Sequence, residues 1–130
     1  MKKLKVSQTR QELLENTIAF YSEDVTRRAF DEGAGGCMYQ TEDGRNCAIG
    51  RELKSPSTFG VATNSSTSGI SCFALMSELP KRLSSMGAGF LCEIQVLHDC
   101  DLHWDTYGLT LMGEDKVNTI CSRHNLKNPL

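Results

Sequence analysis

"FLCEIQVLHD", residues Phe90–Asp99, places its apolar side chains at helical spacing. Phe90, Ile94 and Leu97 stand at positions i, i+4 and i+7, which lie on one face of an α-helix. The glycine-rich "GAG" at 87–89 precedes this segment, and "CDLHWDTYG", a loop with the one tryptophan of the chain, follows it. We therefore expect a helix over 90–99 whose apolar face packs against a core.

The segment "TRQELLENTIAFY" at 9–21 predicts a second helix. Thr9 followed by Glu12 is the capping-box pattern of a helix N-terminus. An apolar stripe at helical spacing follows, made by Leu13, Leu14, Thr17, Ile18 and Tyr21. "MGEDKVNTICSRHNL" at 112–126 predicts a closing helix with Val117, Ile120, Cys121 and His124 on one face. A shorter helix is expected over 71–86, with Pro80 as a break or a second start.

The segment "CMYQTEDGRNCAIG" at 37–50 predicts a β-hairpin. Asp43-Gly44 is the strongest short turn signal in the chain. A two-residue loop there sets the expected cross-strand pairs, which are Gln40 with Cys47, Tyr39 with Ala48 and Cys37 with Gly50. A long loop rich in serine, threonine and glycine follows at 55–69.

These segments predict an α+β fold, a small antiparallel hairpin or sheet packed with four to five short helices. The chain has 130 residues, which is the length of one domain, so residues 1–130 are expected to form a single domain.

Composition and charge exclude several classes of function. Lys plus Arg total 14 and Asp plus Glu total 16, so the net charge is -2, which argues against a protein that wraps duplex nucleic acid. The longest clean apolar run, "FALM" at 73–76, is too short to span a membrane. The start "MKKLKVSQTRQELL" lacks the apolar stretch of a secretory signal. We therefore expect residence in a cytosol, with the six cysteines reduced.

Two adjacent arginines, Arg27 and Arg28 in "DVTRRAF", follow the aromatic pair Phe20 and Tyr21. Such a pair at a helix end is often only a solvated surface favoured by the helix dipole. The functional alternative is anion capture, because a guanidinium group matches phosphate bidentately. Stacking surfaces for a base are offered by Phe20, Tyr21, Phe90, Trp104 and Tyr107, and further phosphate contacts by Arg51 and Arg123.

Motifs for other chemistry are weak. "GAGG" at 33–36 lacks the Lys-Ser/Thr of a P-loop, and neither it nor "GAG" completes a dinucleotide-binding fingerprint. The spacing of His98, Cys100 and His103, with Cys37 and Cys47 as further thiols, only suggests a metal, and we expect none. A nucleophilic set of Cys47 or Cys100 with His98 and Asp99 or Asp101 stays open as an enzymatic alternative.

Four segments together resemble one family of small phage proteins. They are "AFYSEDVTRRAF", "GCMYQTEDGRNCAIGREL", "FLCEIQVLHDCDLHW" and "GLTLMGEDKVNTIC". The series is similar to the first-described anti-Thoeris sponge family, and the resemblance covers most of residues 18–126. It implies a non-enzymatic protein of the host bacterial cytoplasm, without cofactor, that binds a cyclic ADP-ribose isomer and withholds it from a defence effector. It also implies cyclic oligonucleotide binding at a second site and homo-oligomers, from dimers to larger assemblies such as hexamers.

The resemblance also implies roles for particular residues. Arg27 or Arg28 would grip a phosphate, and Phe90 would stack on adenine. Cys100 stands where the family has a polar residue that contacts the ligand, and this departure bears on ligand choice. Arg123 would be a second phosphate contact. Two other functions stay open, a Cys/His enzyme that degrades such a signal and a module that binds a host protein.

Overall fold

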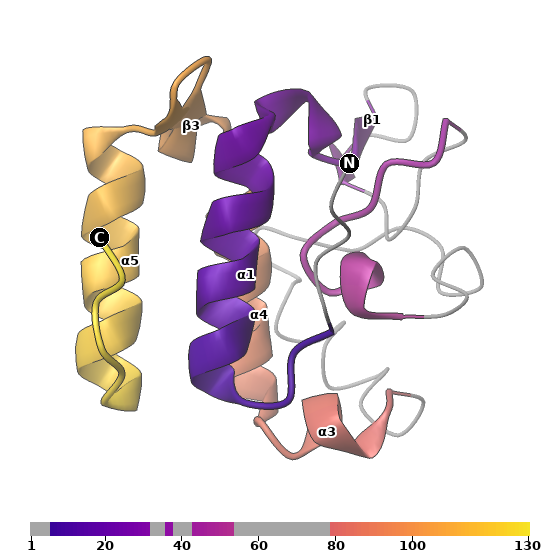
Figure 1. Cartoon of the computed structure of the whole chain (residues 1–130), viewed down its shortest axis with the longest axis vertical. Coiled ribbons are helices and arrows are strands. Elements are labelled where there is room, and N and C mark those ends of the chain that lie inside the picture. Colours follow the sequence, from indigo (N-terminus) through magenta and orange to yellow (C-terminus); the bar gives the residue numbers. More distant parts are fainter. Residues whose placement is uncertain (1–5, 32–35, 38–42, 54–78) are drawn as a thin grey trace.

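Three helices form the centre of the fold, and α4 (Ala88–Asp99) packs against both α1 (Arg10–Glu23) and α5 (Leu111–His124) (Figure 1). The computed structural model describes residues 6–31, 36–37, 43–53 and 79–130. The apolar stripes of the three helices face one another, as the helical spacing requires. Their core consists of Leu13, Leu14, Tyr21, Phe90, Leu91, Ile94, Leu97, Val117 and Ile120.

The predicted start of α1 is confirmed in its details. Thr9 is the N-cap, and its Oγ1 accepts a hydrogen bond from the Glu12 backbone N–H at 3.1 Å. The Glu12 carboxylate reaches back to the N–H of Gln8 at 3.0 Å, one residue before the cap. The helix ends at Glu23, and the carboxylate of the next residue, Asp24, caps a following 3-10 turn, η1 (Val25–Arg27).

The helices predicted over 90–99 and 112–126 are also confirmed. Burial of Phe90, Ile94 and Leu97 follows the expected spacing, although α4 starts two residues earlier, at Ala88. Thr110 caps α5 through a hydrogen bond from the N–H of Gly113. Asn125 closes the helix in the left-handed region at φ 56°, a conformation that asparagine tolerates.

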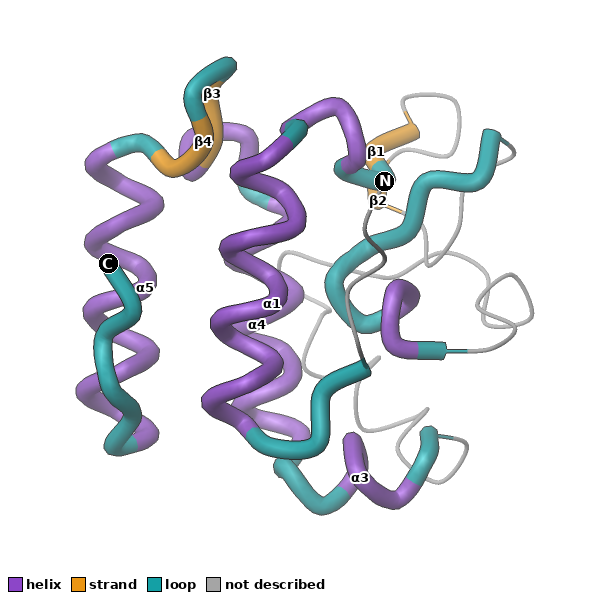
Figure 2. The backbone as a smooth tube through the Cα atoms, viewed as in Figure 1, coloured by secondary structure: helices purple, strands orange, loops and turns teal. Residues whose placement is uncertain are grey.

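Two short antiparallel hairpins lie beside the helices (Figure 2). In the first, β1 (Phe30–Asp31) pairs with β2 (Gly36–Cys37). In the second, β3 (Trp104–Asp105) pairs with β4 (Gly108–Leu109), where the sequence predicted only a loop. The turn is fixed by the Asp105 carboxylate, which accepts from the Tyr107 N–H at 2.8 Å, and by Gly108 at φ 114°.

Of the predicted hairpin register for 37–50, the pair of Cys37 with Gly50 is wrong. Cys37 faces Phe30 rather than Gly50, because Gly50 begins a 3-10 helix, η2 (Gly50–Glu52), instead of a strand. The predicted partners Tyr39 and Gln40 lie outside the described residues. Gly44 does adopt a positive φ of 88°, which the predicted Asp43-Gly44 turn requires.

The α+β class is confirmed, with short helices and small antiparallel hairpins. Helix α3 (Lys81–Ser84) begins directly after Pro80, which supports the second start predicted there. The expected loop at 55–69 and helical residues 71–78 lie outside the described residues. Within the described ranges, no helix has both the length and the apolar character to cross a bilayer.

Candidate ligand-binding site

The structure distributes the seven predicted ligand-binding residues over three places. Phe20 and Arg27 lie at the end of α1 and in η1. A second group surrounds the C-terminus of α4 and consists of Arg28, Cys100 and Trp104. Phe90 in the first turn of α4 and Arg123 in the last turn of α5 form the third, connected through Glu93 and His124. The chain by itself therefore does not gather them into one site.

Arg28 closes the C-terminus of α4. Its Nε donates to the carbonyl of His98 at 2.7 Å, and its Nη2 donates to the carbonyl of Asp99 at 2.8 Å. Nη1 completes the fork with a 2.9 Å ion pair to Asp101. The side chain is only 12% exposed. The guanidinium group thus satisfies helix-end carbonyls that have no partner within the helix.

The buried pair His98 and Asp99 lies under this cap. His98 Nδ1 is 2.6 Å from the Asp99 carboxylate, while its Nε2 accepts from the backbone N–H of Ala29 at 3.3 Å. Nδ1 therefore carries the proton, and burial lowers the pKa of His98. Both ring nitrogens are engaged, so the imidazole is held as a structural group.

Cys47 does not have the character of a nucleophile. Its thiol is buried and accepts from the Gly50 N–H, and burial raises its pKa to about 12. A nucleophilic cysteine needs the opposite shift, toward the thiolate. The geometry around Cys47 and His98 therefore gives no support to the enzymatic alternative.

Trp104 and Cys100 have distinct surroundings beside the cap. The Trp104 ring is buried, and its Nε1 donates to the Leu97 carbonyl at 2.8 Å, so no open stacking face is presented. Cys100 is the half-buried C-cap of α4. His103 Nδ1 lies 3.1 Å from the Leu97 carbonyl oxygen. Among the described residues, no three His, Cys, Asp or Glu side chains are placed to hold a metal ion.

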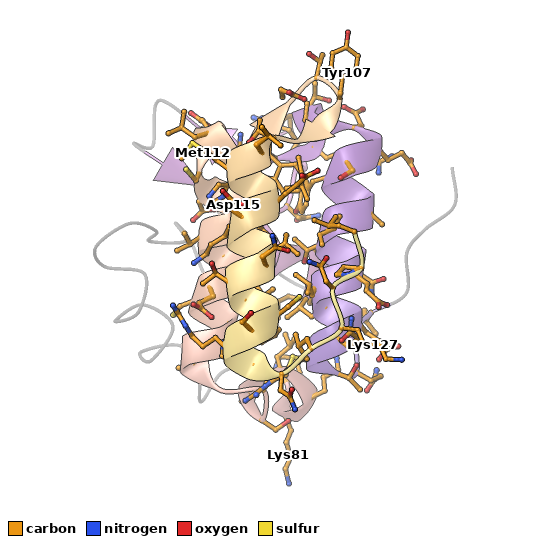
Figure 3. All side chains as sticks on the ribbon, turned by 90° about the vertical axis from the view of Figure 1, so that its left-hand side faces the viewer. Lys81, Tyr107, Met112, Asp115 and Lys127 are labelled. Carbon is orange, nitrogen blue, oxygen red and sulfur yellow. The ribbon has the colours of Figure 1, made fainter. Side chains whose placement is uncertain are left out.

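Phe90 is covered by two neighbours. It is 1% exposed, the His124 ring stands edge-on to it at 5.0 Å, and the Arg10 guanidinium carbon lies 5.4 Å from its centroid. A base can stack on this ring only if one of these neighbours moves. Arg123 is exposed and pairs with Glu93, beside a shallow depression of about 430 Å³ on α5. Its lining residues are Asn118, Thr119, Ser122 and Arg123, on the helix that faces the viewer in Figure 3.

The best-formed combination of arginine and aromatic ring is at Phe20. The guanidinium carbon of Arg27 lies 4.5 Å from the ring centroid, and that of Arg51 lies 5.6 Å from it. Both distances are within the range of cation–π attraction. Arg27 is further fixed by the Phe20 carbonyl at 3.0 Å and by Glu23 at 2.6 Å. We call Phe20, Arg27 and Arg51 the arginine–phenylalanine stack.

Arg51 enters this stack from η2. Its side chain is only 7% exposed, and its Nη2 donates to Glu52. Its Nε is buried and has no hydrogen-bond partner among the residues that the structure describes. A buried guanidinium N–H without an acceptor is costly, and the cost is relieved when a ligand oxygen accepts from it. The sequence marked Arg51 only as a further candidate for a phosphate contact, and 24 positions separate it from Arg27.

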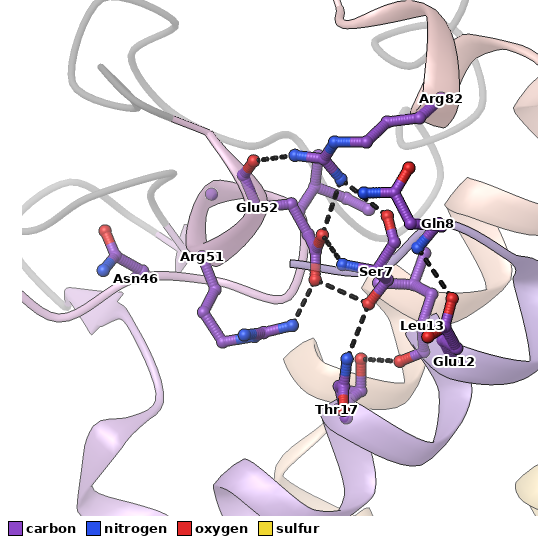
Figure 4. A network of polar contacts seen from close by, with 12 residues as sticks. Ser7, Gln8, Glu12, Leu13, Thr17, Asn46, Arg51, Glu52 and Arg82 are labelled. Carbon is purple, nitrogen blue, oxygen red and sulfur yellow. Dashed lines mark hydrogen bonds and ion pairs between the residues drawn. The ribbon is translucent and has the colours of Figure 1, made fainter. Parts of the chain in front are cut away.

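Glu52 anchors Arg51 through a group that we call the Glu52 clasp, made by Ser7, Arg51, Glu52 and Arg82 (Figure 4). The Glu52 side chain is fully buried. One carboxylate oxygen accepts from the Ser7 N–H and from Arg82, both at 2.7 Å. The other accepts from the Ser7 hydroxyl at 2.8 Å and from Arg51. Nothing in the sequence singled out Ser7, Glu52 or Arg82, because "GREL" has the pattern of an ordinary charged turn.

Comparisons with models of protein families, with curated proteins and with solved structures found no match to this chain.

Proposed function

We propose that this protein binds a nucleotide immune signal and withholds it without chemical conversion. One observation carries the proposal: the Phe20 ring lies against two guanidinium groups, and one of them, Arg51, has a buried N–H without a partner among the described residues. Guanidinium groups bind phosphate oxygens, and the Phe20 ring offers a surface for a base when a ligand draws one of the two guanidinium groups off the ring. The stack therefore has the chemistry that a ligand with both phosphate and base requires.

The likeness of four segments to the anti-Thoeris sponge family supports a particular ligand class. The proposed ligand is a cyclic ADP-ribose isomer, with cyclic oligonucleotides as a further class. The proposed setting is the cytoplasm of a phage-infected bacterium, and the proposed assembly is a homo-oligomer. Oligomerisation fits the wide separation of Phe20, Phe90 and Arg123 in one chain, because a second copy can bring residues of different places to one ligand.

Sequestration is favoured over cleavage by the state of two of the groups that would perform cleavage. His98 has both ring nitrogens engaged, and burial raises the pKa of Cys47 to about 12. A sequestering protein needs affinity alone, and a nanomolar Kd corresponds to about 12 kcal/mol. Phosphate contacts, a stacked base and an enclosed site supply interactions of that order.

The test is a retention experiment. Purified protein is mixed with cyclic ADP-ribose isomers and with cyclic di- and trinucleotides, separated from free compound and heated, and the released compound is identified by mass spectrometry. We expect one unmodified signal to be recovered. Release of a converted product would instead establish the enzyme. A protein that neither retains nor degrades any compound would overturn the proposal and favour a host-protein interaction module.

A matched pair of variants connects this test to the stack. Phe20→Leu keeps apolar bulk but removes the ring, and stacking is worth about 1–3 kcal/mol per base, so retention should weaken roughly 5- to 150-fold. Tyr107→Leu removes an aromatic ring that is 95% exposed at the tip of the second hairpin, and retention should not change. Equal retention by the two variants would place the ligand elsewhere.

A further inference from the structure

We infer that Glu52 is a positioning residue for the ligand site: it holds Arg51 against Phe20, and the buried Arg51 Nε–H, which has no acceptor among the described residues, becomes a phosphate donor when the ligand displaces the groups that cover the stack. The inference rests on the proposed function and adds the group that orients the phosphate contact. It also assigns a role to Ser7 and Arg82, which hold the Glu52 carboxylate and lie in segments far from it in sequence.

The first support is the saturation of the Glu52 carboxylate. Its two oxygens accept four hydrogen bonds, from the Ser7 N–H, the Ser7 hydroxyl, Arg82 and Arg51. Arg82 also donates to the Ser7 carbonyl at 2.9 Å and to the Glu52 carbonyl. Asn16 of α1 donates to the Ser7 hydroxyl at 2.9 Å. A carboxylate held in this way has one orientation, and it transmits that orientation to the guanidinium group it binds.

The second support is the state of Arg51. Its Nη2 is bound to Glu52 and its Nε is buried without a partner in the described part of the chain. An arginine that served only to neutralise Glu52 would gain by turning Nε toward any available acceptor. The clasp instead fixes a donor that finds no acceptor in residues 6–31, 36–37, 43–53 and 79–130, which costs folding free energy and lowers the cost of ordering when an anion binds.

A competing role for Glu52 makes the opposite prediction. As an internal anion, it would repel a phosphate and occupy the donors of Arg51, so removal of its charge would tighten binding. The clasp already compensates this charge, because two guanidinium groups and one carboxylate leave a net charge of +1. Positioning therefore predicts weaker binding for Glu52→Gln, although the variant makes the site more positive.

The experiment is isothermal titration of full-length protein with each cyclic ADP-ribose isomer. We expect Glu52→Gln to raise Kd at least tenfold. Glu52→Asp keeps the charge but withdraws the carboxylate by one methylene, and it should raise Kd by a similar factor. The control is Asp115→Asn, which removes the same charge from an exposed residue of α5, outside both the stack and the clasp (Figure 3). Its effect on charge alone should change Kd by less than about threefold.

Thermal unfolding of each variant separates positioning from loss of the fold. Where Glu52→Gln does not fold, Ser7→Ala removes one donor to the clasp and keeps the carboxylate and Arg51; its Kd should rise about two- to fivefold. Folded Glu52 and Ser7 variants that bind as tightly as wild type, or more tightly, overturn the inference alone. A wild-type protein that binds none of the isomers overturns the proposed function together with it.

Discussion

Replacing Arg28 with alanine is expected to destabilise the fold more than the same replacement at the adjacent Arg27. Arg28 donates to the last two carbonyls of α4, those of His98 and Asp99, and pairs with Asp101. Arg27 pairs with an exposed carboxylate and packs on Phe20. The comparison tests whether the two adjacent arginines have different roles, with Arg28 stabilising the end of α4 and Arg27 belonging to the arginine–phenylalanine stack.

The expected loss of stability follows from the interactions that each replacement removes. A hydrogen bond from a charged donor contributes about 1.5–3 kcal/mol to stability. Arg28→Ala removes two such bonds, and water that enters the space left by the side chain hydrogen-bonds the two carbonyls and so restores part of the lost free energy. The Asp101 pair adds at most about 1 kcal/mol, because this carboxylate is largely exposed. We expect a loss of about 2–4 kcal/mol for Arg28→Ala. For Arg27→Ala we expect about 1–2 kcal/mol, from one hydrogen bond to the Phe20 carbonyl that water partly replaces, one cation–π contact and one surface ion pair.

Urea unfolding followed by circular dichroism at the helical band measures both values, and thermal unfolding checks them independently. At roughly 4 °C per kcal/mol for a domain of this size, Arg28→Ala should lower Tm by roughly 8–16 °C. An Arg28→Ala variant that is no less stable than Arg27→Ala would refute the assignment of Arg28 as the cap of α4. In that case Arg28 would return as a candidate for the phosphate contact.

Three further outcomes are expected. A Cβ at Gly113 would overlap the carbonyl oxygen of His103, so Gly113→Ala should cost about 2–3 kcal/mol in urea unfolding. Gly89→Ala, which meets open space in α4, should be neutral or stabilise by about 0.5 kcal/mol, and equal effects of the two alanines would contradict the packing. Burial lowers the pKa of the His98 imidazole below 6.5. As the pH falls, the unfolded chain therefore binds a proton before the folded protein does, and the free energy of unfolding decreases below pH 6.5. His98→Gln should flatten this dependence by up to about 1.4 kcal/mol per pH unit, and parallel curves for variant and wild type would count against it. Burial raises the pKa of Cys47 to about 12, so iodoacetamide at pH 8 should label Cys47 only in urea, as peptide mass spectrometry will show.

The helices were predictable because their signals are local. The capping pattern at Thr9 and Glu12 and the i, i+4, i+7 spacing from Phe90 depend on a few neighbouring residues, and both are confirmed. The hairpin register was not predictable, because a turn signal specifies the turn but not the secondary structure of the residues that follow it. The Asp43-Gly44 turn is followed by η2 rather than a strand, and η2 is stabilised by burial of Glu52 among donors from distant segments.

The candidate site was only partly predictable for the same reason. Phe20 and Arg27 are seven positions apart, and the sequence placed them together as a ring and a guanidinium group. The second guanidinium group of the stack comes from Arg51, through a contact that no local pattern encodes. The burial of Phe90 and Trp104 could not be predicted either. An aromatic residue in the sequence can pack in the core or bind a ligand, and the local pattern does not distinguish the two.

The adjacency of Arg27 and Arg28 therefore does not produce a joint phosphate grip within one chain. After η1 the backbone becomes extended at Arg28, and the two guanidinium groups take different partners. Arg27 turns back to the carbonyl of Phe20, and Arg28 reaches across to the carbonyl of His98. Loss of binding and loss of stability should consequently separate. Arg27→Ala should weaken ligand retention with the smaller loss of stability, and Arg28→Ala should lower stability first, with retention falling only as the end of α4 loosens.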